Sequence, residues 1–156
     1  MAIVIAETDD DALLAEYYHQ HWLAMGLAPA DVAPDWREGA LAFIAAARRG
    51  RAFAGFVARD AGGPVGGACC HLVERAYPAF RIADAPVVGY VWGVYVEPSS
   101  REHGVGAALV RACLEHLSAR GSGRVLLHAG ERSRPLYERL GFEPTDELAL
   151  ALDART

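Results

Sequence analysis

The segment at residues 87–106 constrains the fold of this chain more than any other part. Residues Val87–Val96 are mostly β-branched or aromatic, which is typical of a strand. Gly104 and Gly106 follow, and Val105–Arg120 carries apolar residues at helical spacing. A strand that passes through a short turn into a glycine-opened helix leaves free backbone N–H groups at the helix start. The segment therefore predicts an anion-binding turn between a strand and a helix.

The remaining patterns alternate between strands and helices without repeats or a linker, which predicts one domain over residues 1–156. Hairpins mixed with crossover helices predict an α/β (α+β) fold with a sheet of mixed direction. The expected strands are Ile3–Ile5, Arg51–Arg59, Val65–Glu74, Val87–Val96, Val125–His128 and Glu147–Leu152. The first expected helix begins within Thr8–Asp11 and runs to about Met25. The other expected helices are Asp35–Arg49, Val105–Arg120 and Ser133–Leu140.

Composition excludes several classes of protein. All 15 basic residues are Arg, so the chain cannot form a Lys Schiff base or a Walker A phosphate loop, and it also has no Asn. A net charge of −5 argues against binding nucleic acid by phosphate neutralisation. With no membrane-spanning apolar run and no signal-like start, we expect a cytoplasmic protein without a membrane partner. Cys69, Cys70 and Cys113 are expected to be buried, reduced thiols.

A second motif lies about thirty residues after the glycine turn. Residues Ser133–Phe142 predict a short helix that presents Tyr137 and ends at a Gly-Phe pair. Arg-x-x-Gly-x-Gly over residues 101–106, followed by Leu-Tyr-Glu-Arg-Leu-Gly-Phe over residues 136–142, resembles the GNAT superfamily of acetyl-CoA-dependent N-acetyltransferases. The resemblance is dense over residues 87–142 and limited to the order of elements before them. It implies a mixed, mostly antiparallel sheet of six to seven strands, about four helices, and a splayed strand pair that forms the acyl-CoA cleft.

The resemblance also implies how the cosubstrate, acetyl-CoA, is held. Backbone groups of Val94, Tyr95 and Val96 would pair with the pantetheine arm as an added strand does. The turn would cradle the pyrophosphate, and its residues are Arg101, Glu102, His103, Gly104, Val105 and Gly106. The hydroxyl of Ser133 is a further candidate contact. Many relatives carry an Asn where this chain has Gly130, so one familiar cofactor contact is missing.

Tyr137 is the expected catalytic proton donor, because the departing thiolate needs a proton or a strong hydrogen bond. The base is a choice between Glu97 and Tyr90, the latter acting through water. By strand alternation Tyr90, Trp92 and Val94 should share one face, which offers no carboxylate and no His. Weaker candidates for this role are His71, Glu74 and His128.

The acceptor is expected to be a primary amine of a small molecule or a peptide. Aromatic residues near the N-terminus, with the loop Tyr77–Arg81, could line its pocket or belong to the core; the N-terminal ones are Tyr17, Tyr18, Trp22 and Trp36. Two alternatives stay open: a catalytically silent acyl-CoA-binding module, and an acyltransferase with another acyl chain or a hydroxyl acceptor. No metal is expected, because His19 and His21 would lie on different faces of a helix. A homodimer is common in the family, but no sequence feature identifies an interface.

Overall fold

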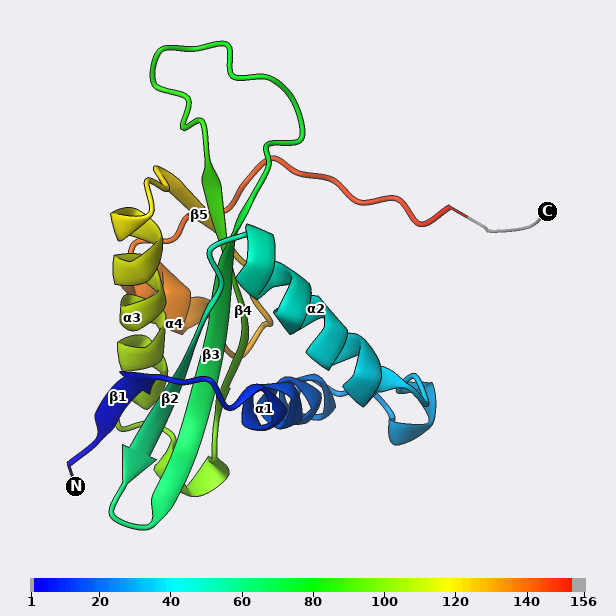
Figure 1. Cartoon of the computed structure of the whole chain (residues 1–156), viewed down its shortest axis with the longest axis vertical. Coiled ribbons are helices and arrows are strands. Elements are labelled where there is room, and N and C mark those ends of the chain that lie inside the picture. The colour runs from blue at the N-terminus through cyan, green and yellow to red at the C-terminus, as the bar shows by residue number, and fades with distance from the viewer. Residues whose placement is uncertain (1, 153–156) are drawn as a thin grey trace.

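The centre of the molecule is one five-stranded sheet with helices on both faces (Figure 1). In the computed structural model, which describes residues 2–152, the strands lie side by side in chain order. They are β1 (Val4–Glu7), β2 (Ala54–Asp60), β3 (Gly63–Val73), β4 (Val88–Val96) and β5 (Arg124–Leu126). Among the first four, each strand is antiparallel to its neighbours, and β5 is parallel to β4. The expected α/β (α+β) sheet, mixed and mostly antiparallel, is confirmed.

Four α-helices flank the sheet in the described part of the chain, as expected. They are α1 (Asp11–Ala24), α2 (Trp36–Gly50), α3 (Val105–Ala119) and α4 (Arg134–Arg139), and short 3-10 turns occur at Pro29–Asp31 and Pro98–Ser100. The start of α1 is fixed by its cap, because the carboxylate of Asp10 accepts a hydrogen bond from the N–H of Leu13 at 3.0 Å. None of the described helices is long and apolar enough to cross a lipid bilayer.

Two apolar cores, one on each face of the sheet, hold the layers together. Leu109 of α3 is fully buried against one face, and Ile44 of α2 is fully buried on the face that α1 and α2 cover. Adjacent strand residues point to opposite faces, so Cys69 lies in the α1–α2 core and Cys70 in the α3 core. Both are buried and free, as is Cys113, which confirms the expectation for the cysteines.

A β-bulge interrupts β4. Trp92 and Tyr95 pair with β3 residues only two positions apart, so Gly93 and Val94 together oppose one residue of β3. Gly93 has a φ of +63°, a left-handed conformation that glycine adopts at low cost. The inserted residue turns the strand over: Val94 packs in the α3 core, whereas Trp92 and Tyr95 contact tyrosines of α1. The expectation that Tyr90, Trp92 and Val94 share one face is therefore wrong at Val94, because alternation fails across an inserted residue.

The described sheet ends at β5, and the strand expected at Glu147–Leu152 is not formed. Residues 143–152, which we call the arm, contain no helix or strand, are all exposed, and run away from the body (Figure 1). The strand expected at Val125–His128 is also shorter and ends at Leu126. The described residues thus hold five strands instead of six or seven. An alternating apolar pattern becomes a strand only where it meets a free edge that accepts its hydrogen bonds.

Candidate active site

β4 and β5 separate after three paired positions, which leaves most of β4 with an open edge. The parallel pairing begins at Val88 and ends at Tyr90, which lies opposite Leu126. β4 continues to Val96, so residues 91–96 have no strand beside them on the β5 side within the described chain. The splayed strand pair that the sequence implied is therefore present. We call the point of separation at Tyr90 the fork.

The open edge presents backbone groups at alternate positions. The N–H of Glu97 donates to a carbonyl of β3 at 2.8 Å, so by alternation Val94 and Val96 direct their backbone groups to the open edge. Both outward carbonyls have side-chain donors in this structure. Nδ1 of His21 lies 3.0 Å from the carbonyl oxygen of Val94, and Nε of Arg101 donates to the carbonyl of Val96 at 2.9 Å.

His21 is a site residue that the sequence analysis missed. Because a carbonyl can only accept, Nδ1 of His21 carries the hydrogen of this bond, which leaves Nε2 as an acceptor when the ring is neutral. Burial lowers the pKa of His21, and the bond to Val94 opposes that shift. The sequence showed only the spacing between His19 and His21. No pattern along the chain connects α1 with a strand edge 73 residues later, so only the tertiary structure brings them together.

The turn from β4 into α3 has the geometry of an anion site. Gly104, the N-cap of α3, has a φ of +78°, and Glu102 has a φ of +65°, which is uncommon for a residue with a side chain. No side chain caps this helix start, and the first α3 residue whose N–H meets a protein acceptor in the described chain is Ala108. Free N–H groups at the positive end of the helix dipole favour a bound anion.

Tyr137 lies on α4, which packs against the start of α3. A Cβ at Gly106 would lie 3.3 Å from Cδ2 of Leu136, so the glycine allows the two helices to approach closely. Tyr137 is 5% exposed, and its ring packs edge-on against Phe142 with 5.8 Å between centroids. Burial raises the pKa of Tyr137, whereas the hydroxyl of Ser133 lowers it. The phenol is therefore protonated at neutral pH and can donate a hydrogen bond.

The loop between β5 and α4 contacts the end of α1. The hydroxyl of Ser133 donates to the carbonyl of Gly130 at 3.2 Å, which holds the loop in shape. A Cβ at Gly130 would lie 3.2 Å from Cε of Met25, which follows α1. A larger side chain at position 130 would therefore have to displace Met25. The glycine at position 130 is thus matched by a packing contact with Met25.

A group of titratable side chains gathers at the fork. The hydroxyl of Tyr90 is hydrogen-bonded to Nδ1 of His128, which follows β5. Nε1 of Trp92 donates to Nδ1 of His71 at 3.0 Å, and the rings of His71 and Tyr90 are 6.5 Å apart. Burial, with a smaller effect of Arg51, lowers the pKa of His71 to about 4. The structure thus joins Tyr90 to two histidines that the sequence offered only as weaker, separate candidates.

The two main candidates for the base lie at opposite ends of the open edge. Tyr90 lies at the fork, and Glu97 follows seven residues later, roughly 23 Å away along a strand. Glu97 directly precedes the turn into α3. Burial is the main cause of the raised pKa of Tyr95, and the charge of Glu97 raises that pKa further. One reacting amine cannot contact both Tyr90 and Glu97.

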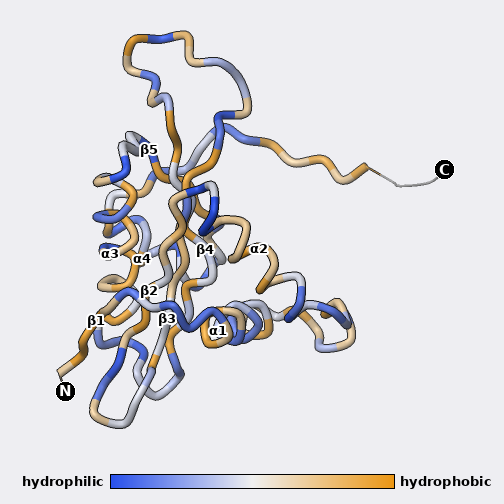
Figure 2. The backbone as a smooth tube through the Cα atoms, in the orientation of Figure 1, coloured by the Kyte–Doolittle hydropathy of each residue, from blue (hydrophilic) through white to orange (hydrophobic). Residues whose placement is uncertain are grey.

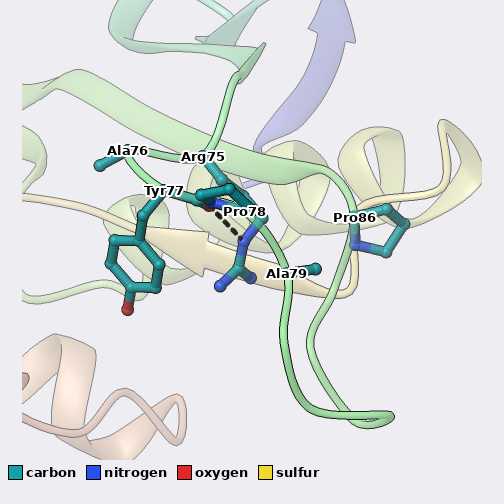
Figure 3. Close-up of a pocket in the computed structure, with 6 residues that line it drawn as sticks. All are labelled: Arg75, Ala76, Tyr77, Pro78, Ala79 and Pro86. Atoms are coloured by element: carbon teal, nitrogen blue, oxygen red, sulfur yellow. Dashed lines mark hydrogen bonds between the residues drawn. The ribbon is translucent and has the colours of Figure 1, made fainter.

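Surface hollows elsewhere offer less chemistry. Figure 3 shows one within the β3–β4 loop, lined by Arg75, Ala76, Tyr77, Pro78, Ala79 and Pro86. The guanidinium of Arg75 is used inside this loop, where it donates to the carbonyl of Ala85 at 2.9 Å and to that of Tyr77 at 3.4 Å. Residues 2–152 contain no cluster of three or more potential metal ligands. The open edge, the turn and the fork therefore form the candidate active site.

An open strand edge that leads into a helix start with free N–H groups can bind an extended ligand that carries phosphate groups. A model of the acetyltransferase (GNAT) family matches residues 14–142, so the chain belongs to that family. A GCN5-related N-acetyltransferase from Ralstonia eutropha JMP134 is 25% identical with a TM-score of 0.83, over 97% of this chain and 99% of that one. A predicted acetyltransferase from Clostridium acetobutylicum, solved with acetyl-CoA, has a TM-score of 0.84 over 97% of this chain and 96% of that one. At 19% identity this likeness shows the fold alone.

Sequence similarity to curated proteins is more local. Glucosamine 6-phosphate N-acetyltransferase from Trypanosoma brucei brucei is 42% identical over 55 residues. This match spans 35% of the present chain and only 37% of that relative. The family assignment rests on the family model, which matches residues 14–142. Glucosamine 6-phosphate is the substrate named for the relative.

Proposed function

We propose that this protein is an acetyl-CoA-dependent N-acetyltransferase that acetylates a primary amine of a small molecule or peptide by direct attack of the amine on the thioester. The observation that carries the proposal is the open edge of β4, which leads directly into the α3 turn with its free N–H groups. The extended pantetheine of acetyl-CoA has amide groups that can pair with such an edge while the phosphates of the cosubstrate contact the helix start. Membership of the GNAT family supports the same chemistry.

Val94 and Val96 would hold the pantetheine arm, because their backbone groups face the open edge. When the cosubstrate binds, N–H groups of the pantetheine would replace His21 and Arg101 as the hydrogen-bond donors to these two carbonyls. Tyr95 lies between them and pairs with Gly67 of β3. Its backbone would therefore hold the strand in place and make no hydrogen bond to the pantetheine. Once released from Val96, the guanidinium of Arg101 would be available to the phosphates, together with the N–H groups of the turn.

We assign the proton-accepting role to Tyr90 and His128 instead of Glu97. The thioester lies at the end of the pantetheine arm far from the pyrophosphate, and Glu97 adjoins the turn that would hold the pyrophosphate. As the amine nitrogen bonds to the carbonyl carbon, the oxygen of Tyr90 would take the amine proton while its own hydroxyl proton passes to Nδ1 of His128. His128 would then release that proton to water.

Tyr137 would act on the sulfur that leaves as the carbon–sulfur bond breaks. Its pKa lies above 10 because of burial, and a thiol has a pKa near 8.5, so complete transfer of its proton would cost about 2 kcal/mol or more. A hydrogen bond from the phenol to the thiolate avoids that cost. We expect Tyr137→Phe to bind acetyl-CoA as the wild type does and to lower kcat by roughly tenfold to a hundredfold. An unchanged kcat would remove Tyr137 from the mechanism.

Aromatic side chains on the α1–α2 side of the fork would contact the acceptor. Trp92 packs edge-on against Tyr18 and Phe43, with ring centroids 5.1 Å and 5.5 Å away. Trp22 is 40% exposed, whereas Tyr17 is 4% exposed and belongs to the core. A partly exposed aromatic surface of this kind suits a small molecule, and the relative named for glucosamine 6-phosphate supports a small-molecule amine.

The decisive experiment measures release of free thiol from acetyl-CoA by the purified chain. The panel of acceptors contains amino sugars, aminoglycosides and peptides with a free amino terminus. Each reaction has a control without the amine. We expect acetyl-CoA to raise the thermal unfolding temperature and at least one amine to release thiol. Stabilisation without turnover would favour the silent acyl-CoA-binding module, and longer acyl-CoAs and hydroxyl acceptors test the remaining alternatives. If acetyl-CoA neither binds nor stabilises the chain, the proposal is wrong.

A further inference from the structure

Arg51 caps the end of α2, and its half-buried side chain is held in place without a carboxylate partner. One turn earlier Arg48 forms an ion pair with Asp11 at 2.7 Å, whereas the side chain of Arg51 forms no ion pair or hydrogen bond within residues 2–152. The guanidinium carbon of Arg51 lies 4.8 Å from the ring centre of Phe43, and its carbonyl accepts a hydrogen bond from the N–H of Leu72 at 2.7 Å. Figure 2 shows this end of α2 as a hydrophilic stretch beside the sheet. A positive charge that is fixed and not neutralised can recognise an anion.

His71 supplies a second hydrogen-bond donor beside this charge. Its ring packs edge-on against Phe43, with 5.5 Å between the centroids, so Phe43 contacts both Arg51 and His71. Nδ1 of His71 accepts the hydrogen bond from Trp92, so in the neutral ring Nε2 carries the hydrogen. Within residues 2–152 this Nε2–H meets no acceptor, and Nδ1 of His19 is the only enclosed side-chain polar atom that lacks a partner. The Nε2–H of His71 therefore reaches solvent and can donate to a ligand.

A negative charge lies near Tyr90, where the reacting amine is placed. Burial raises the pKa of Tyr90, and the charge of Glu147 raises it further, so the carboxylate of Glu147 lies near the phenol. On the α2 side, the rings of Tyr90 and His71 are 6.5 Å apart, and the charge of Arg51 acts, after burial, on the pKa of His71. Opposite charges attract, so a carboxylate near Tyr90 favours an ammonium group there, and the guanidinium favours an anion a short distance away.

We propose that the acceptor carries an anionic group, a carboxylate or a phosphate, which Arg51 and the Nε2–H of His71 bind while the amine lies at Tyr90. The inference rests on the proposed function and narrows its acceptor to a small amine with a negative charge. A guanidinium binds carboxylates and phosphates through two parallel, charge-assisted hydrogen bonds, so it selects such groups over neutral ones. Phe43, which is 41% exposed, would contact the apolar part of the acceptor between the two polar ends. Arg51 and His71 are thus specificity-determining residues and take no part in the transfer.

The experiment compares amines that differ in the anionic group, with thiol release at saturating acetyl-CoA as the measurement. The two pairs are O-phosphoethanolamine with ethanolamine, and phenylalanine with phenylalaninamide. We expect kcat/KM to favour the anionic member of at least one pair about tenfold or more, and the pair that responds distinguishes a phosphate from a carboxylate. Arg51→Gln should lower kcat/KM about tenfold for that member and less than about twofold for its neutral partner, and Arg51→Lys should retain part of the preference.

The matched control is Arg49→Gln, at an exposed position of the same helix, which should keep the wild-type values. Equal values of kcat/KM within both pairs, or equal losses for both members of a pair in Arg51→Gln, would overturn the inference. The neutral amines also check that Arg51→Gln folds, because their turnover needs the rest of the site.

Calorimetric binding separates this inference from the proposed activity. The same four amines are titrated into the chain with and without CoA, which has no acyl group to transfer. We expect an anionic amine to bind the wild type about tenfold more tightly than its neutral partner, and Arg51→Gln to remove that difference. If this preference is present and no thiol is released from acetyl-CoA, the inference stands and the proposed function fails. If thiol is released without a preference for an anionic amine, or neither anionic amine binds, the inference fails.

Discussion

The two ends of the open edge of β4 are built from different parts of the chain. At the α3 end the backbone forms the site: Gly104 in a left-handed conformation places free N–H groups at a helix start. At the fork, side chains from two strands, β3 and β4, and from the segment after β5 form the site, where Tyr90 meets His128 and His71 meets Trp92. The comparison separates binding from reactivity. The backbone end suits holding phosphates, and the side-chain end suits moving a proton.

The largest expected effect comes from the side-chain end. Tyr90→Phe keeps the ring beside His71 and removes only the hydroxyl that bonds to His128. Because general base catalysis contributes about a hundredfold or more, we expect kcat to fall by that factor while the KM for acetyl-CoA stays within about twofold. The measurement is thiol release under saturating acetyl-CoA, across a range of pH.

Glu97→Gln is the matched control for this change, because it removes a titratable group at the other end of the same edge. We expect the acidic limb of its pH–rate profile to match that of the wild type. An acidic limb that moves in Glu97→Gln and stays in place in Tyr90→Phe would reverse the assignment of the two ends.

An intermediate effect is expected at the backbone end. Gly104→Val forces a branched side chain into a conformation with φ +78°, beside the free N–H groups. We expect the KM for acetyl-CoA to rise about tenfold, with kcat largely retained. Gly121→Val is the control, since Gly121 has a similar φ of +86° just beyond the other end of α3 and also has open space around it. Equal loss of cosubstrate affinity in both variants would mean that only strain in α3 was measured.

The smallest expected effect concerns stability at the fork. Burial lowers the pKa of His71 to about 4, below the ordinary 6.5, so between these pH values the unfolded chain binds a proton that the folded chain does not. Stability from the neutral ring is thus present above pH 6.5 and is lost as the pH falls towards 4. We expect His71→Gln to reduce the fall in unfolding temperature between pH 7 and pH 5 by a few degrees. His103→Gln, in the exposed turn, is the control; the same pH dependence in all three proteins would contradict this account.

The backbone end could be predicted from the sequence because its signals are local. The strand and helix expected at Val87–Val96 and Val105–Arg120 occur as β4 and α3, within one residue at each end. Gly104 lies at the start of α3, as expected, and the structure adds that it is left-handed, with a φ of +78°. The exception is Val94, whose face was predicted by strict alternation along the strand. The bulge at Gly93 breaks that alternation, so the predicted face was wrong.

The side-chain end and the arm could not be predicted in the same way. His21, His71 and His128 come from three separate parts of the chain, and no spacing along the sequence shows that they meet β4 near its open edge. Leu148, Leu150 and Leu152 alternate with smaller residues in the segment that was expected to form the last strand. Alternation states which residues share a face, however, and not whether an edge is within reach, so the strand expected there is missing from the sheet.

The side chains that cover the open edge of β4 also bear on solubility. A row of unpaired backbone groups along six residues is a template on which another chain can stack and begin to aggregate. His21 and Arg101 are hydrogen-bonded to the carbonyls of Val94 and Val96 in that row. They therefore make this edge less accessible to the strands of other molecules, and we expect a double His21→Ala, Arg101→Ala variant to precipitate sooner than the wild type.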